Sequence, residues 1–189
     1  TTEDVTVALS TSGTGTEGTD YSTISDITVT AGNTTGTASF TPTDDSVYEG
    51  NETGVVAIST VSGGSANESG TPQEVTITIN DNESAPTVTL SSSATSISED
   101  AGSSLTLTAT LSVATTADVT VGISTSGTGT EGTDYSTISD ITISAGATTG
   151  TASFTPTDDS IYEGNETGIV AISTVSGGSA TEDGTQSVT

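Results

Sequence analysis

The sequence repeats itself with a period of 114 residues, and this period constrains the fold more than any other feature. Residues 11–71 recur as residues 125–185 with seven substitutions, all of them mild. A fixed period of this length is typical of an array of domains. An array spans distance or repeats a binding surface, and an enzyme rarely needs either. The differing pairs are Val29/Ile143, Thr30/Ser144, Asn33/Ala147, Val47/Ile161, Val55/Ile169, Asn67/Thr181 and Ser69/Asp183.

The two copies are cut at different points of the repeat. Residues 86–111 precede the second copy without an equivalent before the first, and residues 74–83 close the first copy alone. Pro86 is the expected boundary, because it follows a polar segment and begins a new apolar run. We therefore expect a window from a longer array. The expected modules are residues 1–85, which lack their first strand, and residues 86–189, which lack their last strand.

The composition excludes several classes of partner. The chain has 25 acidic residues, no Lys, Arg or His, and a formal charge of −25. Nucleic acids and anionic membrane surfaces are excluded as direct partners, because no cationic side chain can neutralise phosphate. The absence of Cys excludes disulfides and thiol chemistry. Each carboxylate must therefore be solvated, hydrogen-bonded or bound to an external cation.

Catalysis finds little support in this composition. Without His, Cys, Lys or Arg, only pairs of carboxylates remain as acid and base groups. The best-placed carboxylates belong to the candidate cation site described below. We therefore expect that the protein is not an enzyme.

Short runs of alternating apolar and polar residues predict an all-β fold. Alternation of this kind is typical of half-buried strands, and Gly- and Asn-rich turns separate the runs. We expect about seven strands per module in an antiparallel sandwich. The apolar positions of the runs are Val75, Ile77 and Ile79; Leu105, Leu107, Ala109 and Leu111; Val119, Val121 and Ile123; Ile141 and Ile143; and Ala152 and Phe154.

The carboxylates concentrate in loops that an antiparallel sandwich brings to one end. In the first copy Asp20 ends a Gly/Thr loop, the run 44–52 reads Asp-Asp-Ser-Val-Tyr-Glu-Gly-Asn-Glu, and Asp81 follows the last strand. Two unit charges 4 Å apart repel by about 4 kcal/mol at an effective dielectric of 20. Such a cluster requires a counterion, and calcium accepts six to eight oxygen ligands in flexible geometry. Zinc and copper sites use His or Cys, which are absent.

Other acidic residues fit a simpler interpretation, in which they keep the surface solvated and the protein soluble. We expect this role for Glu17, Asp26, Asp118, Asp140 and Asp183.

The order of these motifs resembles the Calx-beta domain. The matching motifs are Gly-Thr-Asp-Tyr, Phe-Thr-Pro-Thr-Asp-Asp-Ser-x-Tyr-Glu-Gly-Asn-Glu-Thr and Val-Thr-Ile-x-Ile-Asn-Asp-Asn-Glu. The resemblance covers nearly the whole chain as two incomplete modules. It implies tandem immunoglobulin-like sandwiches with Ca²⁺ bound in the loops at one end. Calcium-sensing members carry a run of acids after the last strand, whereas residues 80–83 alternate amide and acid here, so the resemblance leaves the number of ions open.

Carried over to this sequence, the resemblance implies two sets of calcium ligands, in which Val47 and Ile161 bind through their backbone carbonyls. The first set is Asp20, Asp44, Asp45, Val47, Glu49, Glu52 and Asp81. The second set is Glu99, Asp134, Asp158, Asp159, Ile161, Glu163 and Glu166. None of the side-chain ligands differs between the copies.

Together these features predict a calcium-binding structural repeat of a long extracellular or cell-surface bacterial protein, acting as a rigid spacer in an adhesin stalk or filament. The expected partners are neighbouring modules or identical chains in a fibre. Two alternatives remain open. One is a calcium-sensing or ligand-binding module, which a pair of unlike copies would favour. The other is an acidic halophilic surface domain without specific ions, for which charge would be scattered.

Overall fold

The computed structural model describes residues 1–70 and 73–189 and confirms the all-β prediction. Its one helix among these residues is the short 3₁₀ helix η1 (Glu99–Ala101). The chain divides into two compact units, residues 1–45 with 50–81 and residues 46–49 with 82–189. The boundary expected at Pro86 stays a prediction. The strands are β1 (Val5–Gly13), β2 (Ile27–Val29), β3 (Val47–Tyr48), β4 (Glu52–Ser62), β5 (Glu74–Ile79), β6 (Thr87–Ser92), β7 (Leu105–Leu111), β8 (Ala114–Thr115), β9 (Val119–Gly127), β10 (Ile141–Ile143), β11 (Thr149–Phe154), β12 (Gly168–Ser176), β13 (Thr181–Glu182) and β14 (Ser187–Val188).

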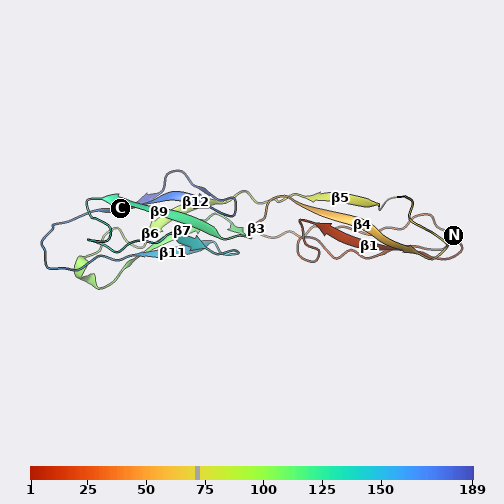
Figure 1. Ribbon diagram of the computed structural model, residues 1–189, viewed down its shortest axis with the longest axis horizontal. Helices are drawn as coiled ribbons and strands as arrows, with labels where there is room; N and C mark the ends of the chain where they lie inside the picture. Colours follow the sequence, from red (N-terminus) through yellow and green to blue (C-terminus); the bar gives the residue numbers. More distant parts are fainter. Residues whose placement is uncertain (71–72) are drawn as a thin grey trace. The chain divides into compact units, whose positions relative to one another are not determined.

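The second unit is a two-layer sandwich. One sheet has the order β10-β9-β12-β14 and the other has the order β11-β7-β6-β13. The pairs within them are antiparallel except for the two-residue pair of β13 with β6. Figure 1 shows β9 and β12 on one side of this unit and β7 and β11 on the other. The antiparallel sandwich predicted from the alternating runs is therefore present.

The core of the second unit lies between its two sheets. The side chains that face one another come from alternating positions, as the two-residue period of a strand requires. Val121 and Ile141 of one sheet are fully buried, as are Val88 and Ala109 of the other. The rest of the buried cluster is Leu90, Leu107, Leu111, Val119, Tyr135, Ile138, Ile143, Val170, Ile172 and Ala180.

The first unit contains one four-stranded sheet of order β2-β1-β4-β5. All of its pairs are antiparallel. Its buried hydrophobic residues are Val5, Tyr21 and Ile79, whereas Val7 and Ile27 stay half-buried. Residues 35–40 do not form a strand. The first unit therefore has far fewer buried hydrophobic side chains than the second unit.

One short strand of the first copy belongs to the second unit. The segment 46–49 contains β3, which pairs in parallel with β8 in a two-stranded sheet. The unit boundary found from contacts therefore does not follow the sequence repeat at this segment.

Candidate metal centre

A tight turn fixes Asp134 in the second unit. The amide of Thr130 donates to Oδ2 of Asp134 at 2.6 Å, and the amide of Asp134 donates back to the Thr130 carbonyl at 2.9 Å. The amide of Thr157 donates to the Asp134 carbonyl at 2.9 Å. The next residue, Tyr135, is 3% exposed and stacks on Phe154 with ring centroids 4.6 Å apart. The buried ring and these hydrogen bonds hold the Asp134 carboxylate in one place.

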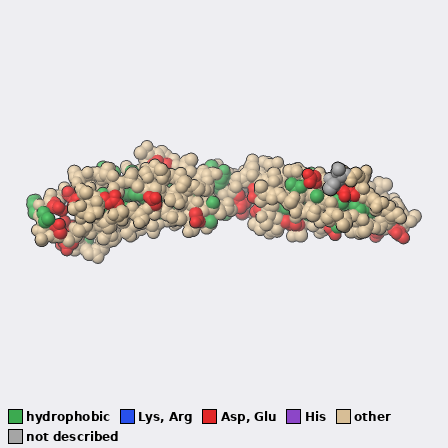
Figure 2. Space-filling model, viewed as in Figure 1, with side chains coloured by type: hydrophobic (Ala, Val, Ile, Leu, Met, Phe, Trp, Pro, Cys, Tyr) green, Lys and Arg blue, Asp and Glu red, His purple; other side chains and the backbone are tan. Residues whose placement is uncertain are grey.

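Asp134 lies beside two glutamates of the loop that leads into β12. One carboxylate oxygen from each of Asp134, Glu163 and Glu166 lies within 4.8 Å of the other two. Asp134 is half-buried and both glutamates are exposed. Figure 2 shows the acidic side chains on the visible face without a basic one. Three carboxylates from two loops therefore converge without any side-chain cation.

Both glutamates of this group have raised pKa values. The pKa of Glu163 is raised by desolvation and then by repulsion from Asp134, Asp159, Glu166 and Glu99. The pKa of Glu166 is raised by desolvation, by repulsion from Asp134 and by a hydrogen bond with it. Both shifts favour the protonated form, so full ionisation of this group is unfavourable in the absence of a cation.

A cavity of about 520 Å³ adjoins the same carboxylates. Glu163 and Glu166 line it together with apolar side chains that include Leu105, Leu107 and Val170. Asp134 and Glu99 line the same cavity.

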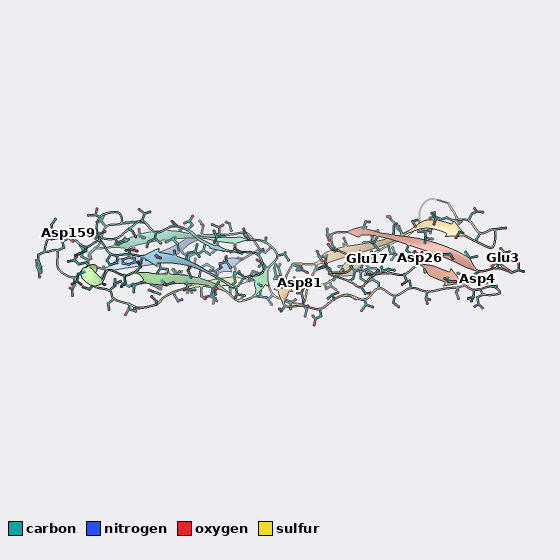
Figure 3. All side chains as sticks on the ribbon, turned by 90° about the horizontal axis from the view of Figure 1, so that it is seen from below. Glu3, Asp4, Glu17, Asp26, Asp81 and Asp159 are labelled. Atoms are coloured by element: carbon teal, nitrogen blue, oxygen red, sulfur yellow. The ribbon has the colours of Figure 1, made fainter. Side chains whose placement is uncertain are left out.

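The other ligands expected in the second unit lie around this group. Glu99 lies in η1 and also lines the cavity. Asp159, labelled in Figure 3, accepts a hydrogen bond at Oδ1 from the Ile161 amide at 2.6 Å. Asp158 is exposed in the same loop. The structure thus brings three of the expected carboxylates together and places Glu99 and Asp159 within electrostatic reach, and their ligation stays a prediction.

The first unit has a corresponding acidic group. Oδ2 of Asp20 accepts a hydrogen bond from the Thr16 amide at 2.5 Å. Oδ2 of Asp81 accepts one from the Gly50 amide at 2.5 Å. The pKa of Glu52 is raised by desolvation, by repulsion from Asp20 and a hydrogen bond with it, and then by repulsion from Asp81. Glu52 therefore interacts with two other predicted ligands of the first copy, Asp20 and Asp81.

The remaining residues of the first set are divided between the units. Asp44 and Asp45 are exposed in the first unit. Val47 and Glu49 lie in the segment that belongs to the second unit, with Val47 half-buried in β3. Their proposed roles as calcium ligands stay predictions.

These donors fit calcium. Both groups offer only carboxylate oxygens, which are ligands for hard divalent cations. Desolvation, and after it repulsion between neighbouring carboxylates, raises the pKa values of Glu52, Glu163 and Glu166. Because the chain has no Lys, Arg or His, an external cation is needed to offset this repulsion while the carboxylates stay ionised.

Several carboxylates expected to be solvated accept hydrogen bonds from backbone amides. Oδ1 of Asp26 accepts a hydrogen bond from the Leu9 amide at 3.0 Å, at the bulge where β1 shifts its register against β4. Glu17 bridges the Thr11 hydroxyl at 2.7 Å and the Ile24 amide at 2.6 Å, and both acids are labelled in Figure 3. Four of the five residues expected to be solvated therefore also accept hydrogen bonds from the backbone, while Asp26, Asp118, Asp140 and Asp183 remain exposed.

The second unit repeats these contacts and shows the sequence signal that could have revealed them. Oδ1 of Asp140 accepts from the Ile123 amide at 3.0 Å, and Glu131 bridges Thr125 and Ile138. Oδ1 of Asp118 accepts from the Ala145 amide at 2.8 Å, while Asp183 is exposed. Asp26 and Asp140 each directly precede a strand, where an acceptor can serve an amide left unpaired by a bulge.

Comparison with known proteins gives one positive result. The sequence model of the Calx-beta domain family matches residues 1–83 and again residues 81–188. A search of curated proteins returns no match. The two matches together cover nearly the whole chain, in the tandem arrangement that the repeat predicts.

Proposed function

Because the chain belongs to the Calx-beta domain family, we propose that it is a calcium-binding structural repeat of a long extracellular bacterial protein, where it acts as a rigid spacer in an adhesin stalk or filament. The Calx-beta domain is a β-sandwich module associated with calcium binding. The observation that carries the proposal is the convergence of Asp134, Glu163 and Glu166 in a chain without cationic side chains.

The proposed role of calcium is to make the fold and the array stiff. Asp134, Glu163 and Glu166 would hold one ion in the second unit, and Asp20, Glu52 and Asp81 would contribute to binding in the first. The ion supplies positive charge that relieves repulsion among the carboxylates. Because the ordered group exists only in the folded chain, binding energy contributes to folding stability. The near-identity of the copies supports a spacer, which needs repetition of one unit.

A melting experiment tests the proposal. Calcium at 100 times its dissociation constant adds about 2.7 kcal/mol to the free energy of unfolding, because it binds the folded state alone. Glu166→Gln removes a charge from the converging group and reduces this gain. Asp183→Asn is the matched control, since Asp183 is exposed and lies outside the group. Equal melting temperatures in calcium and in chelator contradict the proposal.

The same experiment separates the alternatives. A purely halophilic surface gains equal stability from sodium chloride and calcium chloride at equal ionic strength. A spacer shows a larger effect of calcium and a maximum dimension, measured by small-angle scattering, that becomes better defined with calcium. A sensor shows a change of scattering profile over a narrow calcium range.

The raised pKa values predict how pH acts on the calcium-free protein. A carboxyl group with a raised folded-state pKa contributes stability below its unfolded pKa, and this contribution is lost as pH rises through the folded pKa. Glu163 and Glu166 therefore favour the fold in mild acid and oppose it at neutral pH. Saturating calcium should cancel this loss at neutral pH. Melting curves between pH 4 and pH 8, with calcium and with chelator, measure the difference, and parallel curves contradict it.

The location outside the cell is part of the same proposal. Calx-beta domains occur in extracellular regions of proteins, and free calcium is abundant there. Within the described residues, no helix has the length and apolar character needed to cross a membrane. Neighbouring modules or identical chains are the proposed partners, and no enzymatic activity is proposed.

A further inference from the structure

A two-residue strand from the first copy completes an edge of the second unit. Val47 of β3 pairs with Ala114 of β8, and Tyr48 pairs with Thr115, in parallel. Both side chains of β3 are half-buried. Short strand addition of this kind uses backbone hydrogen bonds for affinity and side-chain contacts for specificity.

The second copy carries the same segment in an exposed state. Residues 160–163 read Ser-Ile-Tyr-Glu, against Ser-Val-Tyr-Glu at 46–49. Ile161 is 63% exposed and Tyr162 is 96% exposed, and within the described residues the large hydrophobic side chains with such exposure are these two and Val75. No strand of the described residues includes them. Two adjacent hydrophobic side chains of this segment are therefore exposed, whereas both of their counterparts in β3 are half-buried.

The receiving edge also recurs in both copies. The Thr115 carbonyl accepts from the Gly146 amide at 2.8 Å, and its hydroxyl donates to the Ala117 carbonyl at 2.6 Å. One period earlier, Thr1 accepts from the Gly32 amide at 2.9 Å and its hydroxyl donates to the Glu3 carbonyl. Each copy therefore contains elements of both the inserted strand and the edge that receives it.

We propose that residues 160–163 form a docking strand that pairs in parallel with the β8 edge, Ala114–Thr115, of a second copy of this unit placed after it. This pairing deepens the proposed function, on which it rests, by naming a strand and an edge through which one unit binds a second copy of itself. The contact is heterologous, because the strand and the edge lie at different sites, so it propagates along an array without closing. Covalent linkage supplies the high effective concentration that a two-residue strand needs.

The candidate metal centre flanks the docking strand. The Ile161 amide donates to Asp159 at 2.6 Å, and Glu163 at the end of the strand belongs to the converging carboxylates. An ion held by that group would fix the Glu163 end of the strand. Calcium should therefore strengthen docking by ordering the strand before it pairs.

The test extends the natural chain by one module. Thr189 takes the place of Thr76, because Val188 pairs with Val170 as Val75 pairs with Val56. Continuing the sequence after Thr189 with residues 77–189 places another β8 edge behind the second unit. Hydrogen exchange is then measured, with calcium, at the amides of residues 160–163 in the 189-residue chain and in the extended chain.

We expect exchange in residues 160–163 to slow by about tenfold or more in the extended chain, approaching that of residues 46–49. Unchanged exchange overturns the proposal. A second readout uses Tyr162→Ser, which should leave the melting of the 189-residue chain unchanged, since Tyr162 is 96% exposed there. The same substitution should lower the melting temperature of the extended chain, and equal effects in the two chains contradict docking.

The two proposals fail separately. If exchange slows but calcium does not change the melting temperature, docking is supported and the calcium function is overturned. A calcium-dependent melting temperature with unchanged exchange supports the calcium function and overturns docking.

Discussion

The two units share a nearly identical segment, residues 11–71 in the first and 125–185 in the second, and these segments form different amounts of β-strand. Residues 35–40 and 149–154 both read Thr-Gly-Thr-Ala-Ser-Phe. In the second unit this hexapeptide is β11, fully paired with β7, and in the first unit it forms no strand. In the second unit β7 pairs with this hexapeptide, whereas none of the described strands pairs with it in the first unit. A strand is therefore a property of a segment together with its partner, and the alternating pattern alone does not decide it.

Burial follows the same rule. Ile141 and Ile143 are fully buried, while their counterparts Ile27 and Val29 are half-buried in the same register against β9 and β1 respectively. The second sheet covers the first pair and has no counterpart over the second. In contrast, the stacking of Tyr21 on Phe40 at 4.4 Å matches that of the second unit, because both of its residues lie within the repeat.

Hydrogen exchange provides the largest expected contrast. The amides of residues 149–154 that pair with β7 should exchange only through large-scale opening, whereas those of residues 35–40 should exchange about 1,000-fold faster or more. The identical hexapeptides have equal intrinsic rates, so each serves as the control for the other. Equal protection in the two segments, measured by residue-resolved NMR, would remove the basis of the comparison.

Core substitutions should differ next most strongly. Ile141→Ala leaves a cavity in a fully buried site and should cost about 2–5 kcal/mol of stability. Ile27→Ala removes the same atoms from a half-buried site and should cost roughly half as much or less. Urea unfolding monitored by exchange-protected amides of each unit measures both. A larger loss of stability for Ile27→Ala than for Ile141→Ala would show that Ile27 is the more tightly packed of the two residues.

The two units should differ less in calcium affinity than in hydrogen exchange or core stability. Asp81 adds a carboxylate to the acidic group of the first unit, where it repels Glu52. Asp81→Asn should weaken calcium binding in the first unit by about tenfold, or about 1.4 kcal/mol, because ligand charge sets affinity. Titration followed by NMR signals of each unit measures it, with Asp183→Asn as the control. An unchanged affinity would remove Asp81 from the site.

The hydrogen bonds that Glu17 and Glu131 accept should contribute nearly equal stability in the two units. Hydrogen bonds lower the pKa of Glu17, from the Ile24 amide first and then Thr11, and they lower that of Glu131, from Thr125 first and then the Ile138 amide. This stability is present above the unfolded pKa and is lost as pH falls through the folded pKa. Glu17→Gln and Glu131→Gln should each reduce the melting temperature at neutral pH by similar amounts, with less effect in acid. Unequal losses would show that these bridges depend on the second sheet.

Prediction from sequence succeeded where the causes are local or periodic. The alternating run 105–111 identified β7, and the runs at 74–79, 119–127 and 141–143 identified three further strands. The acidic motifs identified Asp134, Glu163 and Glu166, which the structure brings together. It did not predict the backbone hydrogen bonds of Asp26 and Asp140, because the amides that donate to them lie 17 residues away at bulges that no pattern marks.

The sequence by itself determined the tandem organisation, the all-β class and the lack of any internal cation, because these depend on the period, the alternation and the composition. The tertiary structure alone decided that one hexapeptide pairs and its copy does not. It also decided that Tyr48 is half-buried while Tyr162 is exposed, and which carboxylates converge. The physical reason is that strand pairing, burial and charge repulsion depend on distant segments, and an identical sequence receives different neighbours in the two units.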